Sequence, residues 1–257
     1  MKFLVVGDSC TDKFVYGKCE RICPEAPVPV FTPIKTTVNG GMAKNLQSNV
    51  IALGVSCDIV CDENLMTKIR YVDNKTNHML LRVDENNDPT ETFDCKKVDF
   101  TKYSAVLISL DGRDGKSFLD NEDIRNICFN HSNVFMDCKS ELAMDLPYNL
   151  RFLKINKYEL EINGHLKHRI CSSIDHKYKK QVIVTYGSKG CLYNDKMYAP
   201  PEISEVRDIV GAGDTFLAAF AVSFTQNQNL EDRVDIAINF ANSCASQVVT
   251  KRGVATL

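Results

Sequence analysis

A stretch near the C-terminus constrains the fold of this chain more than any other part of its sequence. Three small residues at 211–213 are followed by Asp214 and by an apolar run that continues to Phe224. A helix that is apolar on every side has to be buried, so the chain must provide layers of structure on both sides of it. We therefore expect a layered protein with a buried helix that begins near Gly213.

The start of this helix also has the chemistry of an anion-binding site. The first turn of a helix leaves backbone N–H groups unpaired and carries positive dipole charge. Glycines at 211 and 213 would let the anionic oxygens of a ligand approach the backbone closely. With Asp214 beside it to accept a hydroxyl proton, such a site suits phosphoryl transfer. A glycine turn before a core helix with a capping Asp explains the same residues, and both interpretations stay open here.

Strands and helices alternate along most of the chain. The expected strands are Phe3–Val6, Cys57–Cys61, Ala105–Leu110, Val134–Asp137, Phe152–Ile155 and Gln181–Tyr186, and the expected helices are Ala43–Leu53, Asn121–Asn130, the run after Gly213 and Val234–Val249. This order predicts an α/β fold of three layers, a mostly parallel central sheet with helices on both faces. Ligands of such a sheet bind at the carboxyl ends of its strands, where Asp8 and Asn156 fall.

Two segments do not follow this alternation. Residues 14–37 contain four prolines and are expected to be extended. Residues 68–94 have the pattern of a hairpin, with Ile69–Val72 and Met79–Val83 as its strands. We expect the two segments to form a small antiparallel β layer on a single domain of residues 1–257. A lid that excludes water from the site is favoured over an extra edge of the main sheet.

The composition excludes several classes of function. A net charge of −2 provides no basic field for nucleic acid and no polybasic patch for a membrane surface. No apolar run approaches the roughly 20 residues that span a bilayer, and the first apolar segment ends at Gly7, too early for a secretory signal. The eleven cysteines include no Cys-x-x-Cys pair and are interpreted as reduced, mostly buried thiols. We expect a cytoplasmic protein with a small-molecule substrate.

The motifs of the chain, in their order, resemble those of the ribokinase-like (PfkB) carbohydrate kinases. Asp208 followed by Gly211-Ala-Gly-Asp214 is similar to the signature of this family. The rest of the chain is similar to one branch, the kinase domain of the bifunctional heptose-7-phosphate kinase/heptose-1-phosphate adenylyltransferase. The segments that carry this second resemblance are Leu4–Asp8, Asp12, Tyr16-Gly17, Arg21–Val30, Gly40-Gly41, Lys68–Arg70, Leu80–Asp84, Asp137–Lys139, Asn156–Glu159, Ala241-Asn242 and Gly253–Thr256.

The resemblance implies a site that transfers the γ-phosphoryl group of ATP to a hydroxyl of a sugar or sugar phosphate. Asp214 would be the general base, beside an anion hole formed by backbone amides. The implied catalytic residues are Gly211, Ala212, Gly213 and Asp214, and those around the sugar are Asp8, Asp12, Gly40, Gly41 and Asn45. Lys68, Arg70 and Arg82 would hold an anionic group of the sugar, because Arg binds phosphate through two parallel hydrogen bonds.

The same resemblance implies a nucleotide side and two cations. The residues that would border ATP are Asn156, Thr185, Gly187, Gly190 and Asn242. Asn156 and Glu159 would hold magnesium, largely through water, which agrees with the partly hydrated oxygen shell that this ion prefers. Asp208 would take part in binding a monovalent cation such as K⁺. An exposed edge of the β lid would offer a surface for a homodimer.

Simpler explanations exist for several of these residues. Asn156 and Glu159 have the residue types of a helix capping box, Asp8 could cap a turn, and basic residues on a hairpin are most often solvated charges. A nucleoside or other small-molecule kinase of the same fold, or a non-catalytic member of the family, would retain much of this pattern.

Three features depart from the heptose-phosphate branch. Lys44 lies where that branch has Asn, which puts the identity of the sugar in doubt. Residues 110–117 match a family loop only loosely; they also resemble a P-loop, but Leu110 replaces its first glycine. The sequence stops soon after Gly253 without an adenylyltransferase segment, so we do not expect a second activity on it.

Overall fold

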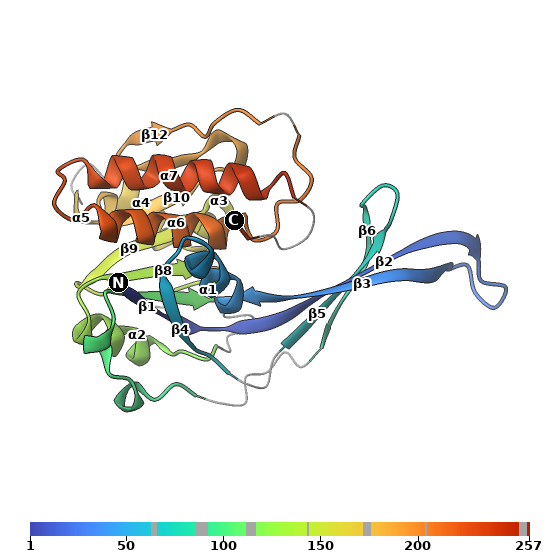
Figure 1. Ribbon diagram of the computed structural model, residues 1–257, viewed down its shortest axis with the longest axis horizontal. Helices are drawn as coiled ribbons and strands as arrows, with labels where there is room; N and C mark the ends of the chain where they lie inside the picture. The colour runs from blue at the N-terminus through green and yellow to red at the C-terminus, as the bar shows by residue number, and fades with distance from the viewer. Residues whose placement is uncertain are drawn as a thin grey trace.

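Two separate sheets organise the chain in the computed structural model (Figure 1), which describes residues 1–62, 66–85, 92–111, 117–142, 144–171, 176–203, 205–251 and 256–257. The larger sheet has the strand order β12-β11-β10-β9-β8-β7-β1-β4. Its strands are β1 (Lys2–Gly7), β4 (Ser56–Val60), β7 (Ala105–Leu110), β8 (Val134–Cys138), β9 (Leu150–Asn156), β10 (Val182–Thr185), β11 (Cys191–Tyr193) and β12 (Lys196–Tyr198). Every pairing from β4 to β10 is parallel, and β11 and β12 add an antiparallel edge.

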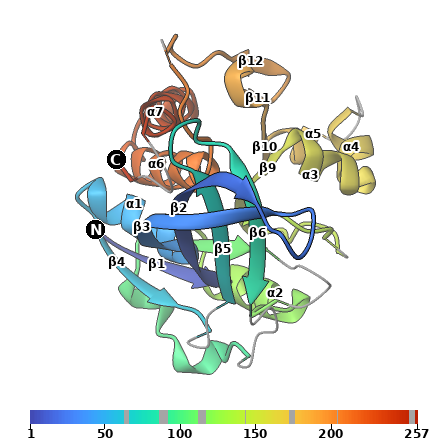
Figure 2. The same cartoon turned by 90° about the vertical axis from the view of Figure 1, so that its right-hand side faces the viewer.

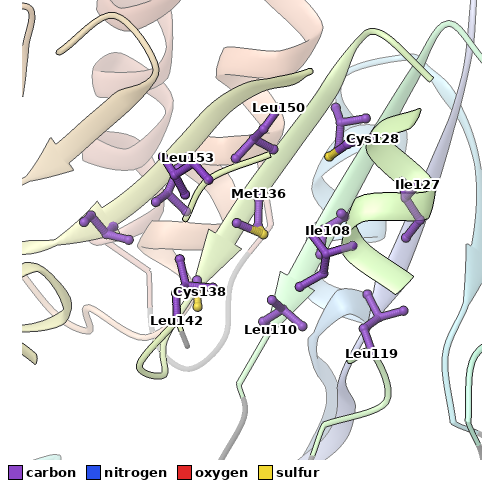
Figure 3. Close-up of a cluster of buried hydrophobic side chains, with 14 of the residues drawn as sticks. Ile108, Leu110, Leu119, Ile127, Cys128, Met136, Cys138, Leu142, Leu150 and Leu153 are labelled. Carbon is purple, nitrogen blue, oxygen red and sulfur yellow. The ribbon is translucent and has the colours of Figure 1, made fainter. Parts of the chain in front are cut away.

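Helices cover both faces of this sheet. One face carries α1 (Ala43–Ala52), α6 (Ala212–Gln226) and α7 (Arg233–Val248), and the other carries α2 (Asn121–Asn130), α3 (Lys157–Ile162), α4 (Gly164–Cys171) and α5 (His176–Lys179). Successive residues of a strand point to opposite faces. Thus Phe3 and Val5 pack with α1 and α6, while Leu4 and Val6 join the cluster under α2. Figure 3 shows part of that second cluster, where side chains of α2 lie near those of β7 and β8. The predicted three-layer α/β fold is confirmed.

The apolar helix predicted after Gly213 is α6, and it is buried along most of its length. All eleven residues from Asp214 to Phe224 are buried. α6 lies between the sheet on one side and α1 and α7 on the other. The ring of Phe220 in α6 packs edge-on against the ring of Phe152 in β9, with 4.9 Å between the ring centroids. Because every side of α6 is covered, a run this apolar can be accommodated without exposing it to water.

The second sheet has the strand order β3-β2-β5-β6. Its strands are β2 (Ser9–Ile22), β3 (Pro29–Met42), β5 (Met66–Asp73) and β6 (Met79–Glu85). The predicted layer from two chain segments is confirmed, and the alternative of an extra edge on the main sheet is wrong. The β2–β3 hairpin extends away from the larger sheet, with β5 and β6 alongside it (Figures 1 and 2).

Two details of this second sheet differ from the prediction. β2 begins at Ser9 and β3 continues to Met42, so the hairpin is longer than residues 14–37. The pairing of β2 with β5 is parallel, although its other pairings are antiparallel. A parallel pairing needs a long crossover connection, and here α1 and β4 supply it between β3 and β5. Part of the predicted 68–94 segment, residues 86–91, lies outside the described residues.

Several short helices, strands and turns were not predicted from the sequence. The unpredicted ones are α3, α4, α5, β11, β12 and the 3₁₀ turns Cys95–Lys97 and Phe100–Lys102. Six of the eleven cysteines are buried, which confirms that most serve as small apolar residues. Across the described ranges, no helix combines the length and apolar character needed to cross a membrane.

Candidate active site

The start of α6 is shaped by a glycine in a left-handed conformation. Gly211 is the N-cap, with φ of 86°, a value that favours glycine because it has no Cβ. The Ala212 amide donates to the carbonyl of Ile209 at 3.3 Å, so one of the three amides expected in the anion hole already has a partner. For the amide of Gly213, no backbone acceptor is found among the described residues. The helix therefore opens with a free donor directly before Asp214.

The Asp214 carboxylate is buried and held from α1. Its side chain is only 8% exposed, and its Oδ2 accepts a hydrogen bond from Asn45 Nδ2 at 2.8 Å. Asn49, one turn further along α1, accepts a hydrogen bond from the Thr215 hydroxyl at 3.1 Å and donates to the Asn45 carbonyl at 2.9 Å. These contacts fix both the carboxylate and its helix against α1. The sequence prediction that Asn45 and Asp214 share one site agrees with this geometry.

Lys139 brings a positive charge to the other oxygen of Asp214. Its Nζ lies 3.6 Å from Asp214 Oδ1, at the end of β8. Burial by itself would lower the pKa of Lys139, but the carboxylates of Asp214, Asp137 and Asp111 outweigh it and raise the pKa. The lysine is therefore charged at neutral pH, and it faces the carboxylate expected to accept a proton.

A second lysine lies directly beneath the helix start. Lys154 of β9 and Asp137 of β8 are cross-strand neighbours, and their Nζ and Oδ1 atoms are 3.0 Å apart. Both side chains are almost fully buried, 4% and 1% exposed. A Cβ added to Gly213 would stand 2.7 Å from Lys154 Nζ. The ion pair thus lies against the α-carbon of an anion-hole residue.

Asn156 and Glu159 form the capping box that was one of two explanations for them. The Glu159 amide donates to Asn156 Oδ1 at 2.9 Å, and the Asn156 amide and side chain donate to the Glu159 carboxylate at 2.6 Å each. Burial raises the pKa of Glu159, while the nearby Lys154 acts in the opposite direction. Thr185 lies opposite Asn156 in the β9–β10 pairing. These residues share the carboxyl end of the sheet with Asp137 and Lys154.

On the side of the smaller sheet, Asp12 and Arg70 form a buried ion pair. The Arg70 guanidinium contacts Asp12 Oδ1 and stacks over the Phe14 ring, 5.0 Å from its centroid. A Cβ on Gly41 would stand 2.2 Å from Asp12 Oδ2, so glycine is required where β3 passes this carboxylate. Asp12, Gly41 and Arg70 are therefore brought together, as the sequence predicted.

Asp8 and Lys68 connect the two sheets through the segment around Asp111. Asp8 accepts hydrogen bonds from the Asp111 and Phe118 amides at 2.7 Å each, and from the Ser117 hydroxyl at 2.8 Å. Lys68 Nζ lies 2.8 Å from Asp111 Oδ2, and both side chains are 5% exposed. Asp8 thus holds the ends of the 111–117 loop, whose central residues 112–116 lie outside the described part of the chain.

Comparison with known proteins decides the family. The sequence model of the pfkB family carbohydrate kinase matches residues 41–257. The chain belongs to the PfkB carbohydrate kinases. It is 30% identical to the "Bifunctional protein HldE" of Helicobacter pylori (strain G27) and 28% identical to that of Helicobacter acinonychis (strain Sheeba), over 99% of this chain. The chain spans 64% of the length of these curated relatives.

Solved structures share the fold of this PfkB kinase. The ribokinase of Thermotoga maritima matches with a TM-score of 0.70 at 18% identity, over 98% of this chain and 94% of that one. A nucleoside kinase of Methanocaldococcus jannaschii has a TM-score of 0.65 at 19% identity, over 98% and 93%. Arabidopsis thaliana ribokinase, complexed with ribose and ATP, has a TM-score of 0.65 at 17% identity, over 98% and 93%. The predicted ribokinase-like fold and the sugar kinase class, a phosphotransferase, are confirmed.

Some of the residues expected to border ATP in this PfkB kinase form a group of their own. A Cβ on Gly190 would stand 1.9 Å from the Tyr198 carbonyl oxygen, and Asn242 Nδ2 donates to the same oxygen at 3.1 Å. Gly187 has φ of 59° and opens the turn before Gly190. These residues lie at the β10–β12 end of the sheet, away from the ion pairs of Asp12 and Lys68.

The remaining predicted residues are Arg82, Gly40 and Asp208. Arg82 binds Asp84 through two hydrogen bonds of 2.7 Å and is directly opposite Arg70 in the β5–β6 pairing. A Cβ on Gly40 would meet the Lys44 side chain at 2.6 Å. Asp208 accepts a hydrogen bond from the Val210 amide at 2.9 Å, just before α6.

Sequence reasoning assigned no role to Lys139, Lys154, Asp137 or Asp111, which the structure places beside the predicted residues. One of them leaves a signal that could have been used. Lys154 interrupts an apolar strand between Leu153 and Ile155, both buried. A charged residue at the centre of a buried parallel strand is rare unless it is paired, so its position alone marks it as special.

Proposed function

We propose that this PfkB kinase transfers the γ-phosphoryl group of ATP to a hydroxyl of a sugar or sugar phosphate, with Asp214 as the general base. The observation that carries the proposal is the placement of Asp214. This carboxylate is buried, is oriented by Asn45, and follows the glycine-opened start of α6. Donors aimed at a developing charge in a site without water stabilise a transition state strongly.

The reaction requires one proton to move and one bond to exchange. The acceptor oxygen forms a bond to the γ-phosphorus, the bond from this phosphorus to the β–γ bridging oxygen breaks, and ADP leaves. Asp214 takes the hydroxyl proton at Oδ1, because Asn45 binds Oδ2 and the Lys139 ammonium lies 3.6 Å from Oδ1, beyond hydrogen-bond distance. Lys139 stabilises the carboxylate before the transfer, and the Gly213 amide faces the phosphoryl group as it moves.

Magnesium fits the carboxyl end of β9. Asn156 and Glu159 would supply oxygen ligands there, and their mutual hydrogen bonds would orient them while leaving lone pairs for bound water. When bound, magnesium neutralises charge on the ATP phosphates. Asp208, next to the glycine N-cap of α6, is the residue proposed to take part in binding a monovalent cation such as K⁺.

The similarity to the HldE proteins supports an acceptor like heptose 7-phosphate. One observation favours a second candidate, an acceptor without phosphate. Each basic residue proposed to hold the anionic group already has a carboxylate partner: Lys68 has Asp111, Arg70 has Asp12 and Arg82 has Asp84. A phosphate would have to displace these carboxylates, whereas neutral hydroxyls need only the acceptor oxygens that the acids present.

The test measures phosphate transfer from ATP to heptose 7-phosphate, free hexoses and pentoses, and adenosine. We expect Asp214→Asn to lower kcat by at least about 10²-fold, while Asp195→Asn, a change of an exposed carboxylate, leaves kcat unchanged. Turnover of heptose 7-phosphate alone would support the first acceptor, and turnover of a free sugar or adenosine the second. ATP binding without turnover of any acceptor would contradict the kinase proposal and favour a non-catalytic family member.

A further inference from the structure

The buried ion pair of Lys154 and Asp137 has no role in the proposed function so far. It lies near the carboxyl ends of the neighbouring parallel strands β8 and β9, where Leu153 and Ile155 flank Lys154 and are buried. Removing two charges from water is costly, and well-packed apolar residues often stabilise such a position equally well or better. Stability alone therefore gives little reason for a lysine here.

The conformation of Gly213 indicates what the lysine faces. Gly213 lies in the first turn of α6 and does not have a positive φ, so its backbone does not require glycine. Within 4 Å of the place for its Cβ, the neighbours found are Nζ and Cε of Lys154, at 2.7 and 3.6 Å. A methyl group would push the ammonium away. The glycine thus keeps the ammonium against the backbone that begins the anion hole.

The ion pair also has unused hydrogen-bonding capacity. An ammonium carries three N–H donors, and the described residues take up one of them, through Asp137 Oδ1. The other carboxylate oxygen, Asp137 Oδ2, is buried and has no hydrogen-bond partner within the described ranges. Buried polar atoms are nearly always paired, and an exception at a site calls for a ligand or a functional reason.

We infer that Lys154 is a further catalytic residue, whose ammonium donates a hydrogen bond to an oxygen of the γ-phosphoryl group as this group passes over Gly213. The inference rests on the proposed function. Asp137 is then a positioning residue, which holds the ammonium between β8 and β9 until the charged group arrives. The lysine adds positive charge beside Gly213, and it takes up no proton, so the balance of the reaction is unchanged.

The test uses a mimic of the transferred group and needs no knowledge of the acceptor. Calorimetry measures the affinity of the full chain, with magnesium, for ADP alone and for ADP with aluminium fluoride, which mimics the moving phosphoryl group. The variants are Lys154→Met and the double variant Lys154→Met/Asp137→Asn. The double variant leaves no unpaired buried charge, so it keeps the experiment interpretable if the single variant does not fold.

In the double variant we expect the affinity for ADP alone to stay within about threefold of wild type. The factor by which aluminium fluoride increases the affinity for ADP should be about 10²-fold smaller than in wild type. kcat should fall by a similar factor, with the KM for ATP nearly unchanged. Equal losses of affinity for ADP and for ADP with aluminium fluoride, or an unchanged gain, would overturn the inference. A wild-type chain that gains nothing from aluminium fluoride would instead contradict the proposed function itself. Lys179→Met, which removes a lysine paired at the surface with Asp195, is the matched control.

Discussion

The two sheets of this kinase distribute charge and apolar surface in opposite ways. In the eight-stranded sheet, both faces are mostly apolar and covered by helices, and the buried Lys154–Asp137 pair lies near the carboxyl ends of β8 and β9. In the four-stranded sheet, the face toward the rest of the molecule buries charge: Asp12, Lys68 and Arg70 are each at most 9% exposed. On its opposite face, Val38 and Leu81 are 60% and 56% exposed, while Val15 and Ile69 are buried.

The smaller sheet thus buries charge on one whole face, whereas the larger sheet buries it only near the carboxyl ends of its strands. Apolar burial accounts for the larger sheet, because area removed from water is its main source of stability. Buried ion pairs add little net stability, so the inner face of the smaller sheet is better explained by a polar ligand between the sheets. Its outer face is better explained by a partner, and we propose a second copy of this chain, paired lid to lid.

The largest effect on stability is expected in the larger sheet. Phe135 of β8 is fully buried, and its ring contacts those of Phe152, Phe220 and Phe224. Phe135→Ala should lower the free energy of unfolding by about 3–5 kcal/mol, because it leaves a cavity among these rings. Urea denaturation measures the loss. A loss below about 1 kcal/mol would mean that this face can repack, and would weaken the contrast between the sheets.

A smaller loss is expected from the inner face of the four-stranded sheet. Lys68→Met removes the buried ammonium that pairs with Asp111 and should cost about 3 kcal/mol. The double variant Lys68→Met/Asp111→Asn removes both charges and should recover most of that loss while weakening acceptor binding. Denaturation and the KM for the acceptor together provide the check. If Lys68→Met is as stable as wild type, the attraction between Lys68 and Asp111 does not contribute to the stability of the fold.

The smallest effect on the stability of one chain is expected on the outer face. Val38→Lys should change the free energy of unfolding by no more than about 0.5 kcal/mol, because the side chain is exposed. It should nevertheless separate a lid-to-lid dimer into monomers, measured by sedimentation. Ile51→Lys is the matched control, since Ile51 is 53% exposed on α1 and outside this sheet. A dimer that persists in Val38→Lys, or a wild-type monomer, would rule out this partner.

Most of the larger sheet could be predicted because its strands are short apolar runs. β7 was predicted with the bounds it has, and β1 and β8 to within two residues. β2 and β3 were harder, because prolines and charged residues conceal two strands of 14 residues each. The register of β2 also depends on its parallel pairing with β5, a partner more than 40 residues away that local patterns do not report.

The candidate site also has residues that the sequence predicts and residues that only the structure brings together. Asp214 and its glycines lie in one continuous motif, so sequence alone points to them. Lys139 and Lys154 come from two neighbouring strands, and only the parallel pairing of β8 and β9 places both next to α6. The capping box at Asn156 shows a further limit: the same residue types serve helix initiation and metal binding, and the pattern does not separate the two.

The hydrogen bond between Asn45 and Asp214 has a consequence for how the protein is made. The two residues are 169 positions apart in the chain. At translation rates of about 5–20 residues per second, Asn45 is added to the chain roughly ten to thirty seconds before Asp214. During that interval α1 has no α6 to cover it, and its buried amide lacks its carboxylate. The contact between α1 and the start of α6 can therefore form only late in synthesis, after Asp214 has been added.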